Sequence, residues 1–190
     1  MSGYSGLLVI IYFEDVLVDV IQNFVLSHFL SVKAAHIISA FLWSFTTISP
    51  MLFYVNPTMK KLKANPDDPE LKRRGEWVLE QMDRVVILEH IALAVLLITG
   101  LMLYASGVAS FASGWFFAKM LIVVGFFVPM EIYDIWLTHV KAPRMERNKE
   151  ADRPKYEAFR KFYYKYLTRL AYPIVVFIPA VLILALTKPF

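Results

Sequence analysis

The apolar positions of this chain come in long runs rather than in short alternating groups. Each run is close to the roughly 20 residues that a helix needs to cross a hydrocarbon core of about 30 Å. The polar positions lie mainly between the runs. The pattern therefore predicts an all-α integral membrane protein, a four-helix transmembrane domain over residues 32–190, with spans at about 32–55, 84–105, 115–137 and 168–187.

The N-terminal stretch, residues 4–31, is apolar but interrupted by acids. Its polar residues recur at helical spacing and form one stripe: Asp15, Asp19, Gln22, Asn23 and Ser27. With Glu14 the stretch carries three acids, which would be costly in a single span. We therefore predict that residues 1–31 form a separate amphipathic helix in the membrane interface. A fifth transmembrane helix and a docking face for a partner subunit are the two alternatives.

The segments between the spans differ in basic residues. Residues 56–83 and 138–167 are rich in Lys and Arg, whereas the connector 105–114 has none. Asn56-Pro57 is expected to end the first span, because proline disfavours a helical conformation in the residue before it. The positive-inside rule then predicts that both basic segments are solvated loops in the cytoplasm. In the first of them a short amphipathic helix could lead into the next span.

The composition supports a membrane protein of one domain. Of 190 residues, 58% are hydrophobic and 19% are charged, compared with about 45–50% and 25% in soluble domains. The net charge of +4 resides in the two basic loops, so it indicates membrane orientation and not nucleic-acid binding. The chain has no cysteine, which excludes disulfides, iron–sulfur clusters and thiolate metal sites.

Two charged residues interrupt the third run, Lys119 near its start and Glu131 near its end. A charge within a bilayer costs roughly 2.5–3.5 kcal/mol, so it usually faces a partner or a cavity. One interpretation is that both side chains reach opposite interfaces. The other is that they face the interior of the bundle, where they accept protons or fix a ligand.

The topology sorts the unusual residues into two layers. His36 and Lys119 lie near the outer ends of their spans, and His90 and Glu131 near the inner ends. Glu89, Asp134, Arg84 and Arg169 belong to the inner layer as well. The two histidines differ in depth by roughly half of the bilayer, so they are poor candidates for one iron. Each histidine could bind a separate group, or one could be a ligand and the other a proton carrier. The structural alternative is that each histidine only forms a hydrogen bond to a neighbouring helix.

The available ligands favour haem over zinc. A zinc site needs three or four clustered ligands, and neither layer has three histidines. A haem needs one histidine and tolerates Met, Lys or water opposite. His36 and His90 are the candidate iron ligands, and Arg84 and Arg169 could hold the propionates through bidentate contacts. The basic runs could instead bind anionic headgroups.

Other residues are assigned to the membrane boundary. The four tryptophans, Trp43, Trp77, Trp115 and Trp136, lie near span ends and are interpreted as interfacial anchors. His28 and His139 are interpreted as solvated or lipid-facing.

Several motifs resemble the HemJ-type family, the oxygen-independent membrane protoporphyrinogen IX oxidases that bind haem b. They are residues 32–38 (VKAAHII) with Trp43 downstream, 114–121 (GWFFAKML), 160–163 (RKFY) and the ending 181–190 (VLILALTKPF). The similarity covers about residues 32–190. The chain departs from the family at 131–134 (EIYD), where the family has a histidine, and at 169–173 (RLAYP). The first 31 residues are additional.

The resemblance implies a haem b protein of a bacterial inner (plasma) membrane, with His36 as haem ligand and Lys119 as the intramembrane lysine. It implies electron transfer from a porphyrinogen toward a quinone or respiratory chain. His90 could replace the missing histidine of the third span from the adjacent helix.

These observations predict a haem b membrane redox protein in which Lys119 or Glu131 accepts protons. The alternative is a non-catalytic anchor subunit, with or without haem, that joins a larger redox complex through its N-terminal helix or forms a homo-oligomer. A third class is a small transporter that uses Lys119 and Glu131 as a proton relay.

Overall fold

The computed structural model describes residues 16–189, and all regular elements in this part of the chain are helices. The helix Val16–Ser27 comes first. It is followed by α2 (Phe29–Pro50), η1 (Met51–Val55), α3 (Asn56–Ala64), α4 (Pro69–Ala105), α5 (Gly114–Ile122), η2 (Val123–Phe127), α6 (Val128–Trp136), η3 (Leu137–Lys141), α7 (Ala142–Arg147) and α8 (Arg153–Thr187), where η marks a π-helical turn.

These elements join into long continuous helices. Four of them, Phe29–Ala64, Pro69–Ala105, Gly114–Arg147 and Arg153–Thr187, are long and apolar enough to cross a membrane. The predicted all-helical chain with four membrane-length helices is therefore confirmed at this level.

The helices extend well beyond the predicted spans. Most of residues 56–83 and 138–167 is helical, which is far more than the one short amphipathic helix expected before the second span. Only short segments, 65–68 and 148–152, separate the helices at this end. Asp68 caps α4 by accepting from the backbone N–H groups of Glu70 and Leu71, and Asp152 caps α8 in the same way. Hydropathy marks where lipid contact ends, whereas these caps mark where the helices begin.

Proline does not end the first long helix as predicted. Pro57 follows the π-turn η1, in which the N–H of Asn56 donates to the carbonyl of Met51, five residues back. The same arrangement precedes Pro129 after η2 and Pro143 after η3. A π-turn widens the backbone locally, which leaves room for the proline ring that an α-turn would push against a carbonyl. The helix therefore continues through each proline.

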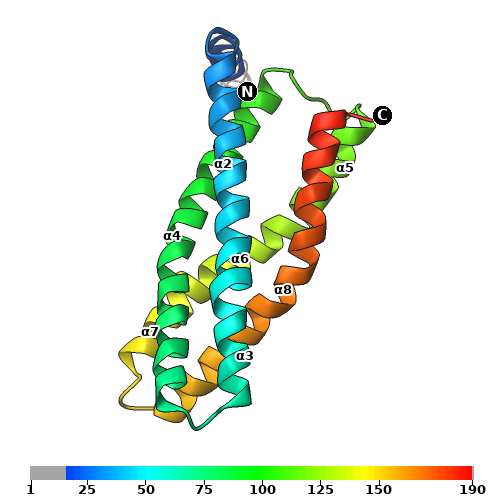
Figure 1. Ribbon diagram of the computed structural model, residues 1–190. Coiled ribbons are helices and arrows are strands. Elements are labelled where there is room, and N and C mark those ends of the chain that lie inside the picture. The colour runs from blue at the N-terminus through cyan, green and yellow to red at the C-terminus, as the bar shows by residue number, and fades with distance from the viewer. Residues whose placement is uncertain (1–15, 190) are drawn as a thin grey trace, which may run out of the picture.

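The long helices form two pairs that cross. α2 packs along α4, and α5 packs against α8, while α5–α7 run obliquely past α2 and α4 (Figure 1). The main core lies at the crossing and holds Trp43, Ala92, Phe127, Met130, Ile174 and Ile178. Toward the α3 end a second core, centred on Met51, Val55 and Val86, joins η1 to α4.

The helix Val16–Ser27 lies at the end of the bundle that also holds the C-terminus of α8 (Figure 1). Gln22 Nε2 donates to the Ala105 carbonyl at 2.9 Å, and Val25 is fully buried. Glu14, and Asp15 of the predicted stripe, lie outside the described residues. Asp19, Asn23 and Ser27 are exposed, so among the described members of the stripe only Gln22 contacts the bundle.

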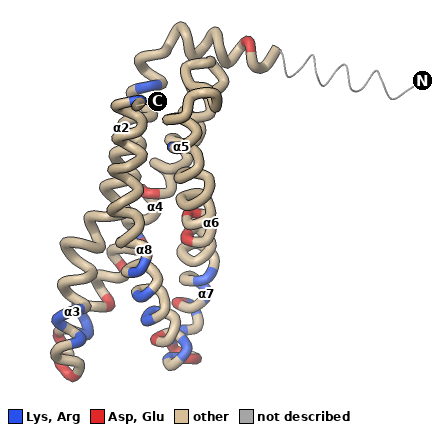
Figure 2. The backbone as a smooth tube through the Cα atoms, turned by 90° about the vertical axis from the view of Figure 1, so that its right-hand side faces the viewer, with Lys and Arg blue, Asp and Glu red and all other residues tan. Residues whose placement is uncertain are grey.

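Charge separates the two ends of the molecule. Lys and Arg gather at the end formed by α3, α7 and the start of α8, with few of them elsewhere (Figure 2). At this end Arg160 pairs with Asp83 and Arg153 with Glu76, each at 2.8 Å, which ties α8 to α4. The flanks between the ends expose large apolar side chains such as Phe41, Phe53 and Leu121. This distribution fits a multi-pass membrane protein.

Candidate functional site

Three carboxylate side chains are buried near the helix crossing. Glu89 is on α4, and Glu131 and Asp134 are on α6; they are 5%, 3% and 8% exposed. We call these three residues the carboxylate cluster. Burial of an ionised carboxylate is costly unless it is paired or hydrogen-bonded, so its partners determine what the cluster can do.

Helix α2 supplies two hydrogen-bond donors to the cluster. The indole Nε1 of Trp43 donates to Glu131 Oε1 at 2.8 Å, and the hydroxyl of Thr47 donates to Glu89 Oε1 at 2.7 Å. Trp43 is 6% exposed and packs edge-on against Phe127. Its assignment as an interfacial anchor is therefore wrong: its indole N–H serves a buried acid.

A second set of polar contacts extends the cluster toward α8. The Thr138 hydroxyl lies 3.4 Å from Asp134 Oδ2, to which it donates, and 3.1 Å from the hydroxyl of Tyr163. The Tyr166 hydroxyl reaches the Met130 carbonyl at 3.5 Å. Helices α2, α4, α6 and α8 thus all border one polar region inside an apolar bundle.

His90 faces the cluster with one nitrogen. Its Nε2 lies 3.5 Å from Asp134 Oδ2 and 3.7 Å from Glu131 Oε2, which is ion-pair distance without hydrogen-bond geometry. His90 Nε2, Glu131 Oε2 and Asp134 Oδ1 are all buried and have no hydrogen-bond partner within the described chain. Unsatisfied buried polar atoms on three neighbouring side chains mark a place where a proton or a water molecule would be held.

The other nitrogen of His90 points to a second histidine. His90 Nδ1 and His139 Nε2 are 2.8 Å apart, and the two rings lie at 57° to one another. His139 is on η3 and is exposed. The interpretation of His139 as a merely solvated or lipid-facing residue therefore misses its contact, which links the carboxylate cluster to the outside of the bundle.

The outer pair of predicted residues lies toward the opposite end. His36 on α2 is half-buried, and its Nδ1 lies 3.2 Å from the Leu96 carbonyl and 3.1 Å from Thr99 Oγ1. The carbonyl can only accept, so Nδ1 carries the hydrogen. Gly100 approaches the ring so closely that a Cβ there would lie 3.2 Å from His36 Cε1. Lys119 on α5 is half-buried.

This geometry distinguishes the two candidate iron ligands. His36 Nε2 has no hydrogen-bond partner among residues 16–189, whereas its Nδ1–H is fixed by a backbone carbonyl. That is the usual arrangement of a metal-binding histidine, whose second nitrogen is oriented by a hydrogen bond. His90 differs, because its unpartnered Nε2 faces two carboxylates and its Nδ1 faces the exposed His139 instead of a backbone carbonyl. We therefore retain His36 alone as the candidate ligand.

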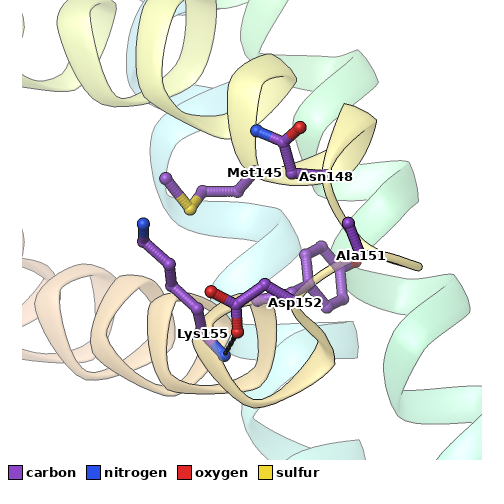
Figure 3. Close-up of a pocket in the computed structure, with 6 residues that line it drawn as sticks. Met145, Asn148, Ala151, Asp152 and Lys155 are labelled. Atoms are coloured by element: carbon purple, nitrogen blue, oxygen red, sulfur yellow. Dashed lines mark hydrogen bonds between the residues drawn. The ribbon is translucent and has the colours of Figure 1, made fainter.

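The candidate propionate ligands make no contact with either site that would fix them in place. Arg84 on α4 and Arg169 on α8 are exposed, and neither pairs with an acid of the described chain. No group of three or more His, Asp or Glu residues in residues 16–189 is arranged to hold a metal ion. A cavity of about 160 Å³ lies at the turn between α7 and α8, away from the histidines; it is lined by Met145, Asn148, Ala151, Asp152, Lys155 and Tyr156 (Figure 3).

Sequence reasoning placed His90 and Glu131 in one layer, and the structure brings them together. It missed the roles of Thr47, Thr138 and His139. A signal for one of them was available, because Glu131, Asp134 and Thr138 are spaced at i, i+3 and i+7 and so share one helix face. A polar face on a membrane helix is expected to point inward.

Comparison of the chain with protein-family models, with curated proteins and with solved structures gives no match. The resemblance to the HemJ-type family therefore rests on the sequence motifs alone and stays a prediction.

Proposed function

We propose that the protein is a haem b-binding membrane redox protein in which His36 would hold the iron. The observation that carries the proposal is the His36 ring: its Nδ1–H is fixed by the Leu96 carbonyl, and its Nε2 is left for a metal. Bound haem b would supply one-electron chemistry. Because haem needs only one protein histidine, the lack of a larger ligand cluster among the described residues is compatible with it.

In this proposal the other residues hold charge and protons. Lys119 holds a charge within the bundle, and Glu131 exchanges protons with His90, whose Nε2 is 3.7 Å away. Arg84 and Arg169 are exposed and would need to turn inward to hold propionates. By the resemblance, the electron donor is a porphyrinogen and the acceptor is a quinone. The basic end would face the cytoplasm of a bacterial inner membrane.

A second candidate function is favoured by the carboxylate cluster. Buried acids next to a histidine inside a membrane bundle are typical of proton-coupled transporters, and such a function needs no haem. The third candidate, an anchor subunit of a larger complex, draws support from the helix Val16–Ser27, whose polar residues Asp19, Asn23 and Ser27 remain exposed for a partner.

The test is a reduced-minus-oxidised absorption spectrum of the purified protein, produced with adequate haem supply. We expect a b-type α band that is lost in His36→Ala and kept in His28→Ala, the control at an exposed histidine. His90→Ala should also keep it. A colourless wild-type preparation would contradict the proposal and leave the transporter and anchor functions. Full haem retention in His36→Ala would contradict the assignment of His36 as the ligand. With haem present, oxidation of protoporphyrinogen by a quinone would separate an enzyme from a haem-bearing anchor.

A further inference from the structure

We propose that His90 and His139 form a proton path between the carboxylate cluster and the surface of the bundle near its basic end. The path would let Glu131 and Asp134 exchange protons with the aqueous phase, although both are almost completely buried. The inference rests on the proposed function and deepens it, because it explains how the buried proton acceptor Glu131 loses its proton again. It does not itself require haem.

The contacts of the path are continuous. Its inner end is His90 Nε2, at 3.5 Å from Asp134 Oδ2 and 3.7 Å from Glu131 Oε2. These distances allow direct transfer after a small approach of the groups. The middle step is the 2.8 Å contact from His90 Nδ1 to His139 Nε2. The outer end is the exposed ring of His139, two residues before Lys141.

The unsatisfied atoms argue that the inner end is used for protons and is not merely structural. A structural histidine would be expected to complete its hydrogen bonds, yet His90 Nε2, Glu131 Oε2 and Asp134 Oδ1 are buried without partners. His90 has a side chain that is only 10% exposed and points its free nitrogen at both acids. A proton located at any of these atoms would supply the donor that the group lacks.

Imidazole is suited to this transfer because it can gain a proton at one nitrogen and lose one at the other. A protonated carboxyl of Glu131 or Asp134 gives its proton to His90 Nε2 and becomes a carboxylate. The resulting imidazolium gives its Nδ1 proton to His139 Nε2 and returns to the neutral form. His139 then releases the proton on its Nδ1 to water, so one proton leaves the cluster and no bond between heavy atoms changes.

Groups on every neighbouring element face this path and influence it. They are Trp43 and Thr47 from α2, Glu89 from α4, Thr138 from η3, and Tyr163 and Tyr166 from α8. Among them only Glu89 is an acid, and it is held by Thr47, so Glu131 and Asp134 are the carboxyls in direct reach of His90.

The experiment is a rapid pH jump on the full-length protein in detergent, followed by infrared spectroscopy of the carboxyl C=O stretch. Glu131→Gln and Asp134→Asn assign the bands. We expect His139→Ala to slow their protonation and deprotonation at least about tenfold, because it removes a proton-transfer group. Added imidazole should restore the rate by occupying the space of the lost ring. The matched control is His28→Ala, which removes another exposed histidine and should leave the rate unchanged.

Because His139 is exposed, His139→Ala is expected to fold, and recovery by imidazole separates a lost relay from a distorted bundle. A wild-type rate in His139→Ala would overturn the proposal, and so would a slow rate that imidazole does not restore. Bands of Glu131 and Asp134 that never respond to pH would overturn it as well. The absorption spectrum tests haem separately, so loss of the redox proposal and loss of the proton path are distinguishable.

Discussion

The hydrogen bond between Trp43 and Glu131 gives the sharpest test of the buried site. Replacing Trp43 by Phe keeps an aromatic ring that can still pack near Phe127 but removes the only N–H of the side chain. Glu131 Oε1 then loses a donor that is 2.8 Å away. Water cannot easily replace it, because Trp43 and Glu131 are 6% and 3% exposed.

The size of the effect depends on the charge of Glu131. A hydrogen bond to a charged group contributes about 1.5–3 kcal/mol, and one between neutral groups about 0.5–1.5 kcal/mol. The smaller phenyl ring adds a packing loss of its own. A double-mutant cycle of Trp43→Phe with Glu131→Leu removes that contribution and leaves the coupling between the two side chains. We expect a coupling of about 1.5–3 kcal/mol if Glu131 is ionised and about 0.5–1.5 kcal/mol if it is protonated.

The measurement is equilibrium unfolding of the four proteins of the cycle in mixed detergent micelles, monitored by circular dichroism. Trp77→Phe is the matched control, because Trp77 is 56% exposed and should change the free energy of unfolding little. A coupling near zero in the cycle would refute the assignment of Trp43 as a donor to Glu131, and with it the description of this region as a polar site.

Two further predictions concern neighbouring contacts. Thr47→Val should lower the free energy of unfolding by about 1–3 kcal/mol, because Glu89 loses its 2.7 Å donor. Thr47→Ser keeps a hydroxyl and should retain most of the stability. Equal losses in the two variants, measured by the same unfolding assay, would count against the contact. Gly100→Ala should cost about 1–3 kcal/mol and disturb the His36 ring, since its Cβ would lie 3.2 Å from that ring. Gly125→Ala is its control, with nothing within 4 Å of the added methyl; equal stability of the two variants would show that the His36 ring moves aside freely.

The long helices were predictable from the sequence because lipid imposes a simple rule on composition. Apolar runs of about 20 residues locate the spans regardless of side-chain detail. The ends were not predictable in the same way. Helix α4 begins at Pro69, within a charged segment, because Asp68 caps it and not because hydropathy changes there. Likewise, the break expected at Pro57 fails because a π-turn accommodates the ring.

The depth of the site residues within the membrane was predictable from the sequence, but the direction in which each side chain points was not. Placing His90 and Glu131 in one layer needed only their positions in the spans. Trp43 was misassigned because the preference of tryptophan for interfaces concerns depth and does not tell which face of the helix carries the residue. The contact of His139 with His90 escaped notice because it joins η3 to α4, and the positions of two residues within their spans do not tell which faces of two helices oppose one another.

The π-turn η2 separates Lys119 from Glu131 on the third long helix. Such a turn carries one residue more than an α-turn, which amounts to a rotation of about 100° between the segments on either side. The third long helix therefore points Lys119 and Glu131 in two directions around its axis that differ from those in an uninterrupted α-helix. Deleting a single residue from Val123–Phe127 would turn η2 into an ordinary α-turn. Either Lys119 or Glu131 would then rotate away from its present neighbours, while the number of spans would stay the same.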